Sequence, residues 1–231
     1  MHLLIIILII CFVIFLFGLH VLAKEDLVFV RKNVTMETLF NLAFYTAGIG
    51  LLSSRIVYVI LHFSKGFLNP LVFFLFPYFP GLSLAGGVAG AMLFVMFYKS
   101  KKYPNGRILD FFAMAFLGAL PFGYVGEQLL LGMQDKFIGI LMPIIFLSTL
   151  LFFVKVLLPL NVRGEIEDGS LGFLFLLIFS FTTLLSHIVR AKNVISLITQ
   201  VDSILLILLF IAALVLLIIQ EKKIQLPRKS K

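Results

Sequence analysis

Long apolar segments constrain the fold of this chain more than any other feature of its sequence. Hydrophobic residues make up 61% of 231 positions and charged residues 13%, whereas a typical soluble domain has about 25% charged residues. A helix needs roughly 20 apolar residues to cross the hydrocarbon core of a membrane. We therefore expect an all-α integral membrane protein. We also expect one helical domain over residues 1–231, since no second domain or internal repeat is visible.

The apolar runs predict about seven transmembrane helices. Their expected ranges are Leu3–Leu22, Leu39–Phe63, Leu82–Tyr98, Ile108–Leu131, Phe137–Leu160, Ser170–Arg190 and Ile195–Gln220. Prolines interrupt the stretch between the second and third ranges, so Leu71–Phe79 is expected to be a re-entrant or interfacial segment. The first run is interpreted as a span and not as a signal peptide, because it exceeds the roughly 7–15 apolar residues of a signal core.

Basic residues predict the orientation of the bundle. With the N-terminus outside, the outer loops hold only Lys65, Lys136, Arg190 and Lys192, and most other lysines and arginines fall in inner loops or the C-terminal tail. The positive-inside rule therefore favours an N-out, C-in, multi-pass protein of a plasma membrane. The net charge of +8 is accordingly interpreted as a topology signal, and no nucleic-acid partner is expected.

Sequence motifs for cofactors and metals are absent. We find no Walker loop, dinucleotide fingerprint, nucleophile elbow or metal-ligand spacing, so neither a cofactor nor a metal is predicted. The single cysteine, Cys11, lies inside the first apolar run and is expected to be a buried thiol.

Polar side chains inside the expected spans are the candidate site residues, because such groups are costly in lipid and face the bundle interior or a wet cavity. All of them lie near the predicted outer ends of their helices, at similar depth. They are Arg55, Tyr58 and His62 on one face of the second span, Tyr124, Glu127 and Gln128 on the fourth, Thr183 and His187 on the sixth, and Gln200 and Asp202 on the seventh. We expect a polar chamber beneath the outer membrane surface.

Structural alternatives stand beside these functional interpretations. Arg55 and Glu127 could form an ion pair without further function. Either histidine could be an interfacial residue with water at one end. Asp110 is expected to stabilise the N-terminus of the fourth helix through the helix dipole.

The stretch from Glu37 to Gly132 resembles the prolipoprotein diacylglyceryl transferases of bacteria. Residues 53–59, Ser-Ser-Arg-Ile-Val-Tyr-Val, resemble the family's Gly-Gly-Arg-x-Gly-Tyr stretch, and residues 83–88, Ser-Leu-Ala-Gly-Gly-Val, resemble its Ser-Phe-His-Gly-Gly-Leu motif. Residues 110–111 match its Asp-Phe pair, and residues 69–71 match its re-entrant connection. Weaker similarity runs from Gly169 to Arg190 and includes Gln200. The family has seven helices in the orientation that the charges predict.

The resemblance implies transfer of a diacylglyceryl group from phosphatidylglycerol to a cysteine thiol of a lipoprotein precursor. The chain departs from the family's catalytic positions: its histidine falls on Ala85, its two arginines fall on Tyr124 and Thr183, and its asparagine falls on Glu127. His62 and His187 are then the candidates for a catalytic base. The residues expected to bind phospholipid are Arg55, Tyr58, Gly86, Gly87, Tyr124, Gly126, Glu127, Arg190 and Gln200.

Two hypotheses of different classes arise from these substitutions. One is a divergent transferase whose base has moved to His62 or His187. The other is a catalytically inactive relative that binds phospholipid or lipoprotein precursors. A third possibility, an unrelated small transporter, is ranked lowest because the polar groups lie away from the bilayer midplane.

Overall fold

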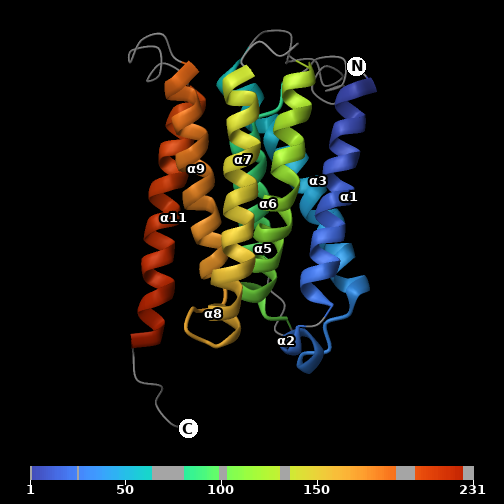
Figure 1. The fold of residues 1–231 in the computed structure, drawn as a ribbon, viewed down its shortest axis with the longest axis vertical. Coiled ribbons are helices and arrows are strands. Elements are labelled where there is room, and N and C mark those ends of the chain that lie inside the picture. The colour runs from blue at the N-terminus through green and yellow to red at the C-terminus, as the bar shows by residue number, and fades with distance from the viewer. Residues whose placement is uncertain are drawn as a thin grey trace.

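The computed structural model describes residues 2–24, 26–63, 81–98, 103–130, 136–190 and 201–225, and all regular structure within these ranges is helical. The long helices lie side by side in one bundle (Figure 1). They are α1 (His2–Ala23), α2 (Leu27–Arg31), α3 (Met36–Leu61), α5 (Leu84–Phe97), α6 (Asn105–Leu130), α7 (Lys136–Phe152), the π-helical turn η2 (Phe153–Leu157), α8 (Leu158–Val162), α9 (Ser170–Arg190) and α11 (Val201–Gln225).

The predicted fold class, an all-α membrane protein, is confirmed. Six helical stretches of the described residues are long and apolar enough to cross a membrane, and one of them joins α7, η2 and α8 as Phe137–Val162. The predicted third span corresponds to α5, which is apolar but only 14 residues long. The predicted segment Leu71–Phe79 and residues 195–200 of the predicted seventh span lie outside the described residues.

Helix α6 forms the core of the bundle. Its most apolar stretch is 72% buried, against 50% or less for each of the other candidate spans, and it packs against α1, α7 and α9. Aromatic rings pack against each other at these contacts. Phe112 packs edge to face on Phe15 of α1, and Tyr124 stacks on Phe146 of α7. Residues on α6 can therefore contact most of the other helices.

Glycines allow α5 to approach α3 closely. A Cβ atom added at Gly86 would lie 2.6 Å from Cβ of Val57, and one added at Gly90 would collide with the side chain of Ser53. The first turn of α5 is capped by Ser83, whose Oγ accepts a hydrogen bond from the N–H of Gly86. This is the close-packing role expected of small residues in membrane helices.

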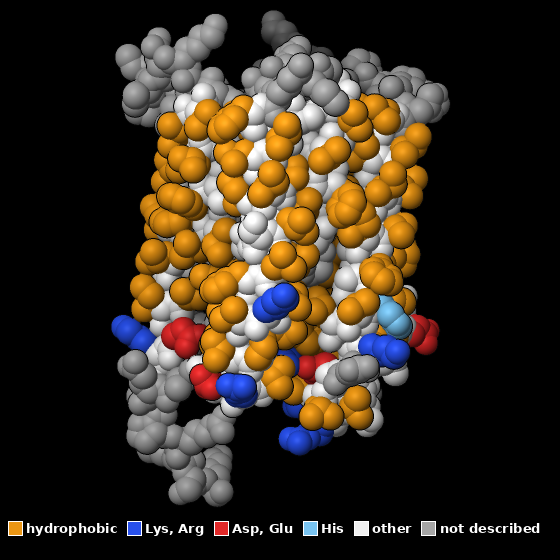
Figure 2. All heavy atoms as spheres, in the orientation of Figure 1, with side chains coloured by type: hydrophobic (Ala, Val, Ile, Leu, Met, Phe, Trp, Pro, Cys, Tyr) orange, Lys and Arg blue, Asp and Glu red, His pale blue; other side chains and the backbone are white. Residues whose placement is uncertain are grey.

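Among the side chains that the structure describes, the charged ones gather at one end of the bundle. We call this the lower end, where α11 ends, and we call the opposite end, where α1 begins, the upper end (Figure 1). On the face shown in Figure 2, the sides of the bundle are covered by hydrophobic side chains, and Lys, Arg, Asp and Glu lie mainly at the lower end. With the orientation that the basic residues of the sequence predict, the lower end would be the cytoplasmic end.

Candidate functional site

Arg55 lies near the upper end of α3, and its side chain is buried, with 3% of its surface exposed. Its Nη1 donates a hydrogen bond of 2.8 Å to the carbonyl oxygen of Gly81. Gly81 has φ of +148°, and a Cβ atom there would collide with the ring of Tyr58, so only glycine fits this position without strain. The N–H of Ser83 also donates to the carbonyl oxygen of Ser54. Together these contacts fix the start of α5 against the end of α3.

Tyr58 and His62 follow Arg55 on the same side of α3. Their rings stack with centroids 4.6 Å apart and planes tilted by 20°, as the four-residue spacing allows. Nε2 of His62 then lies 4.0 Å from Oδ2 of Asp202, the second residue of α11. The side chains of His62 and Asp202 are 48% and 33% exposed, respectively. The imidazole is therefore accessible and lies beside a carboxylate.

The first turn of α11 contacts histidines from two different helices. Asp202 lies beside His62, the C-cap residue of α3. Oγ of the buried Ser203 lies 3.3 Å from Nδ1 of His187 on α9. Consecutive residues of a helix point about 100° apart, so neighbouring positions of α11 can serve two neighbouring helices. This places the contacts of both candidate bases on adjacent residues of one helix.

Thr183 extends the polar contacts to α6. It lies one turn before His187, and its Oγ1 is 3.4 Å from the hydroxyl oxygen of Tyr124 in a buried contact. Polar side chains from four helices, α3, α11, α9 and α6, thus lie close together at the upper end. Each contacts another of these side chains, and contacts between helices join α3 to α11, α11 to α9 and α9 to α6. We call these residues the upper-end cluster: Arg55, Tyr58, His62, Tyr124, Thr183, His187, Asp202 and Ser203.

The three glycines predicted to bind phospholipid face neighbouring helices. Gly86 and Gly87 meet α3, where Cβ of Ser54 would lie 3.2 Å from a Cβ atom at Gly87. Gly126 meets α1, where a Cβ atom would lie 2.5 Å from Ile7. Their direct contact with phospholipid stays a prediction.

Three other candidates keep the status of predictions. Glu127 is half-buried on α6, and its pairing with Arg55 stays a prediction. Gln200 and the side chain of Arg190 lie outside the described residues.

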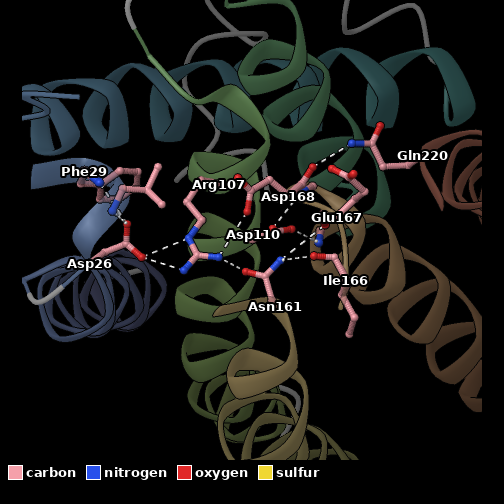
Figure 3. A network of polar contacts seen from close by, with 12 residues as sticks. Asp26, Phe29, Arg107, Asp110, Asn161, Ile166, Glu167, Asp168 and Gln220 are labelled. Carbon is pink, nitrogen blue, oxygen red and sulfur yellow. Dashed lines mark hydrogen bonds and ion pairs between the residues drawn. The ribbon is translucent and has the colours of Figure 1, made fainter. Parts of the chain in front are cut away.

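A second polar network, which the sequence did not predict, lies at the lower end (Figure 3). Arg107 of α6 is its centre and is 3% exposed. Its Nη2 and Nε lie 2.7 and 3.0 Å from Oδ2 of Asp26, before α2. Its Nη1 donates to Oδ1 of Asp168, at 3.2 Å, and to Oδ1 of Asn161 in α8. The sequence places Arg107 only in an inner loop, because its partners come from distant segments.

The predicted role of Asp110 is wrong. Its carboxylate is fully buried and accepts hydrogen bonds from the backbone N–H groups of Gly169, at 2.7 Å, and Gly172, at 2.8 Å. Helix α6 begins at Asn105, so Asp110 lies beyond its first turn. Asp110 instead caps the N-terminus of α9, because those N–H groups have no partner within their own helix.

Metal binding finds no support in the described residues, where no group of three or more His, Cys, Asp and Glu side chains is placed to hold an ion. The upper-end cluster contains a buried guanidinium, two imidazoles, hydroxyls and a carboxylate. Such groups can bind an anion and accept a proton.

Comparison with known proteins identifies one family. The family model of prolipoprotein diacylglyceryl transferase matches residues 2–219, nearly the whole chain and all of the upper-end cluster. No curated protein matches the chain, and no solved structure matches it.

Proposed function

The chain belongs to the prolipoprotein diacylglyceryl transferase family, and from this premise we propose that it transfers a diacylglyceryl group from phosphatidylglycerol to a cysteine thiol of a lipoprotein precursor. The proposed location is a bacterial plasma membrane. The observation that supports this function best is the arrangement of the upper-end cluster. The accessible ring of His62 lies beside the carboxylate of Asp202. It also stacks on Tyr58, whose ring in turn contacts the buried guanidinium of Arg55.

The reaction sets two requirements on the site. A bond forms between the cysteine sulfur and the glycerol carbon of the lipid, and the bond between that carbon and the phosphate oxygen breaks, so that glycerol phosphate leaves. A free cysteine has a pKa of about 8.5, so a base must take the thiol proton. A cation must also stabilise the charge on the departing phosphate.

Arg55 is the proposed phosphate-binding group. A guanidinium has five N–H donors in a planar arrangement that suits phosphate oxygens. The hydrogen bond to Gly81 holds one of its nitrogens in place, which orients the plane of the group. Burial strengthens its attraction for an anion, because few water molecules screen the charge.

His62 is the proposed base, with Asp202 as its positioning residue. The Asp202 carboxylate lies 4.0 Å from Nε2, where it can orient the imidazole ring. The exposed ring of His62 can also be reached by a peptide thiol. His187 contacts Ser203 and is the second candidate for the same role.

One observation favours the alternative, a catalytically inactive relative that binds phospholipid or lipoprotein precursors. By the resemblance, Tyr124 and Thr183 occupy the positions of the family's two arginines, and here their hydroxyls lie 3.4 Å apart in a buried contact. Two cationic positions are thus replaced by a neutral pair. The position of the family's histidine is the buried Ala85, which cannot transfer a proton.

A single assay separates the two functions. Purified full-length protein is incubated with phosphatidylglycerol and a peptide that carries a lipoprotein-type cysteine, and the product is analysed by mass spectrometry, with an active family member as positive control. A diacylglyceryl thioether would support the transferase. Saturable binding of phosphatidylglycerol without any thioether would overturn the transferase and support the binding protein.

A further inference from the structure

Helix α2 is a five-residue element outside the candidate spans. It covers Leu27–Arg31 and joins α1 to α3 at the lower end of the bundle (Figure 1). It therefore lies at the opposite end from the upper-end cluster, and any role of its surface is independent of the proposed function.

One side of α2 is attached firmly to the bundle. Phe29 is 2% exposed and packs edge to face on Phe111 of α6, with ring centroids 5.2 Å apart. Asp26 caps the helix by accepting hydrogen bonds from the N–H groups of Val28 and Phe29. The same carboxylate is held by Arg107. These contacts fix which side of α2 faces away from the protein.

The outward side of α2 combines apolar and basic residues. Leu27 and Val30 are 76% and 66% exposed, although they belong to no candidate span. Lys24, Arg31 and Lys32 are exposed beside them. Figure 2 shows hydrophobic side chains with Lys and Arg next to them at the lower end. Asp26 reduces this positive charge little, because its carboxylate is paired with Arg107.

We propose that this surface of α2 docks on the headgroup layer of the adjoining leaflet and recruits anionic phospholipid there. Leu27 and Val30 would insert at the boundary of the acyl chains, and Lys24, Arg31 and Lys32 would contact lipid phosphates. Exposed apolar side chains beside basic ones are typical of helices that lie in the membrane interface. Basic residues near an anionic leaflet are each attracted to it. With the predicted orientation, this is the cytoplasmic leaflet.

A tryptophan reporter can test this proposal, because the chain contains no tryptophan. The variant Leu27→Trp is reconstituted in bilayers with equal amounts of phosphatidylserine and phosphatidylcholine, and bromine, which quenches indole fluorescence, is carried by one lipid at a time. Phosphatidylserine is anionic but is not the proposed substrate. A Phe17→Trp variant, on the exposed side of α1 within a span, serves as the control for ordinary lipid contact.

The expected result is stronger quenching by brominated phosphatidylserine than by brominated phosphatidylcholine at position 27, and equal quenching by both at position 17. The excess at position 27 should disappear at high salt. It should also disappear when Lys24→Gln, Arg31→Gln and Lys32→Gln are combined with the reporter.

Two results would overturn the proposal. Emission typical of an indole in water, unaffected by either brominated lipid, would show that α2 does not touch the membrane. Quenching that is equal for both lipids and unchanged by the Lys24→Gln, Arg31→Gln and Lys32→Gln substitutions would show apolar contact without recruitment of anionic lipid. Because the substituted basic side chains are exposed, the folded bundle should tolerate these changes.

Discussion

The guanidinium of Arg107 and the carboxylate of Asp26 form a buried ion pair, with 2.7 Å between Nη2 and Oδ2 and with exposed fractions of 3% and 6%. The pair joins the core helix α6 to the connection between α1 and α2. Asn161 and Asp168 complete the surroundings of the guanidinium, so one side chain links three separate segments of the chain.

We expect Arg107→Ala to destabilise the protein strongly. Removing one partner of a buried ion pair leaves the other charge uncompensated, which costs about 3–5 kcal/mol. Asp26→Asn should cost less, because Asp168 still contacts the arginine and asparagine is also a good N-cap residue. Thermal unfolding in detergent measures both effects, with Arg163→Ala on the exposed surface as the matched control. Equal thermal unfolding midpoints for Arg107→Ala and Arg163→Ala would contradict a structural role of the ion pair.

Replacing Asp110 with alanine should loosen the start of α9. The N–H groups of Gly169 and Gly172 would lose their acceptor, and each buried unsatisfied group costs about 1–3 kcal/mol. Hydrogen exchange of these two amides should accelerate in Asp110→Ala, and less so in Asp110→Asn, which keeps one carbonyl oxygen. In Glu165→Ala, an exposed acidic position nearby, exchange should stay as in the wild type. Unchanged exchange in Asp110→Ala would refute the capping role.

Two glycine-to-alanine substitutions should have effects of opposite sign. In Gly86→Ala, the new methyl group would lie 2.6 Å from Cβ of Val57, and such overpacking costs about 1–3 kcal/mol. In Gly48→Ala the methyl group meets nothing within 4 Å, and alanine stabilises a helix interior by roughly 0.5–1 kcal/mol. Unfolding midpoints measure both effects. Alanine at position 57 would keep the Cβ atom that lies closest to the new methyl group, so the rescue variant is Val57→Gly, which should partly restore the Gly86→Ala variant. A stabilised Gly86→Ala would contradict the close packing of α3 and α5.

The proposed base can be identified by comparing the two histidines. If the transferase assay gives product, His62→Gln should lower kcat by about 10²–10⁴-fold, the range for loss of a general base. Asp202→Asn should reduce kcat by less, because it removes the positioning residue and not the base. A wild-type kcat in His62→Gln together with a large loss in His187→Gln would move the assignment to His187.

The helices of this protein were largely predictable from its sequence. The range Ser170–Arg190 was predicted with both ends correct, because a polar, glycine-containing loop precedes a continuous apolar run. The same-side arrangement of Arg55, Tyr58 and His62 followed from helical spacing alone. The sequence did not predict the short elements. Helix α2 has only five residues, and the π-helical turn at Phe153–Leu157 lies within a continuous apolar run whose pattern does not distinguish it from an α-helix.

Contacts between helices were less predictable. The meeting of polar residues at the upper end was expected from their similar depth, but depth does not give partners, and the contacts of Asp202 with His62 and of Ser203 with His187 came only from the structure. Asp110 was assigned to its own helix because local rules consider only neighbouring residues. Its hydrogen-bond donors are 59 and 62 positions away.

The sequence by itself determined that this chain crosses a membrane as helices, because hydrocarbon offers backbone groups no partners and apolar segments must satisfy them internally. Only the packing of the helices decided which buried charged side chains form ion pairs with one another. Arg107 and Asp26 are 81 positions apart, and only the arrangement of α6 against α1 and α2 brings them together. Local hydrogen bonding governs the formation of the membrane-spanning helices. The fit of side chains between distant segments governs the pairing of the buried charges.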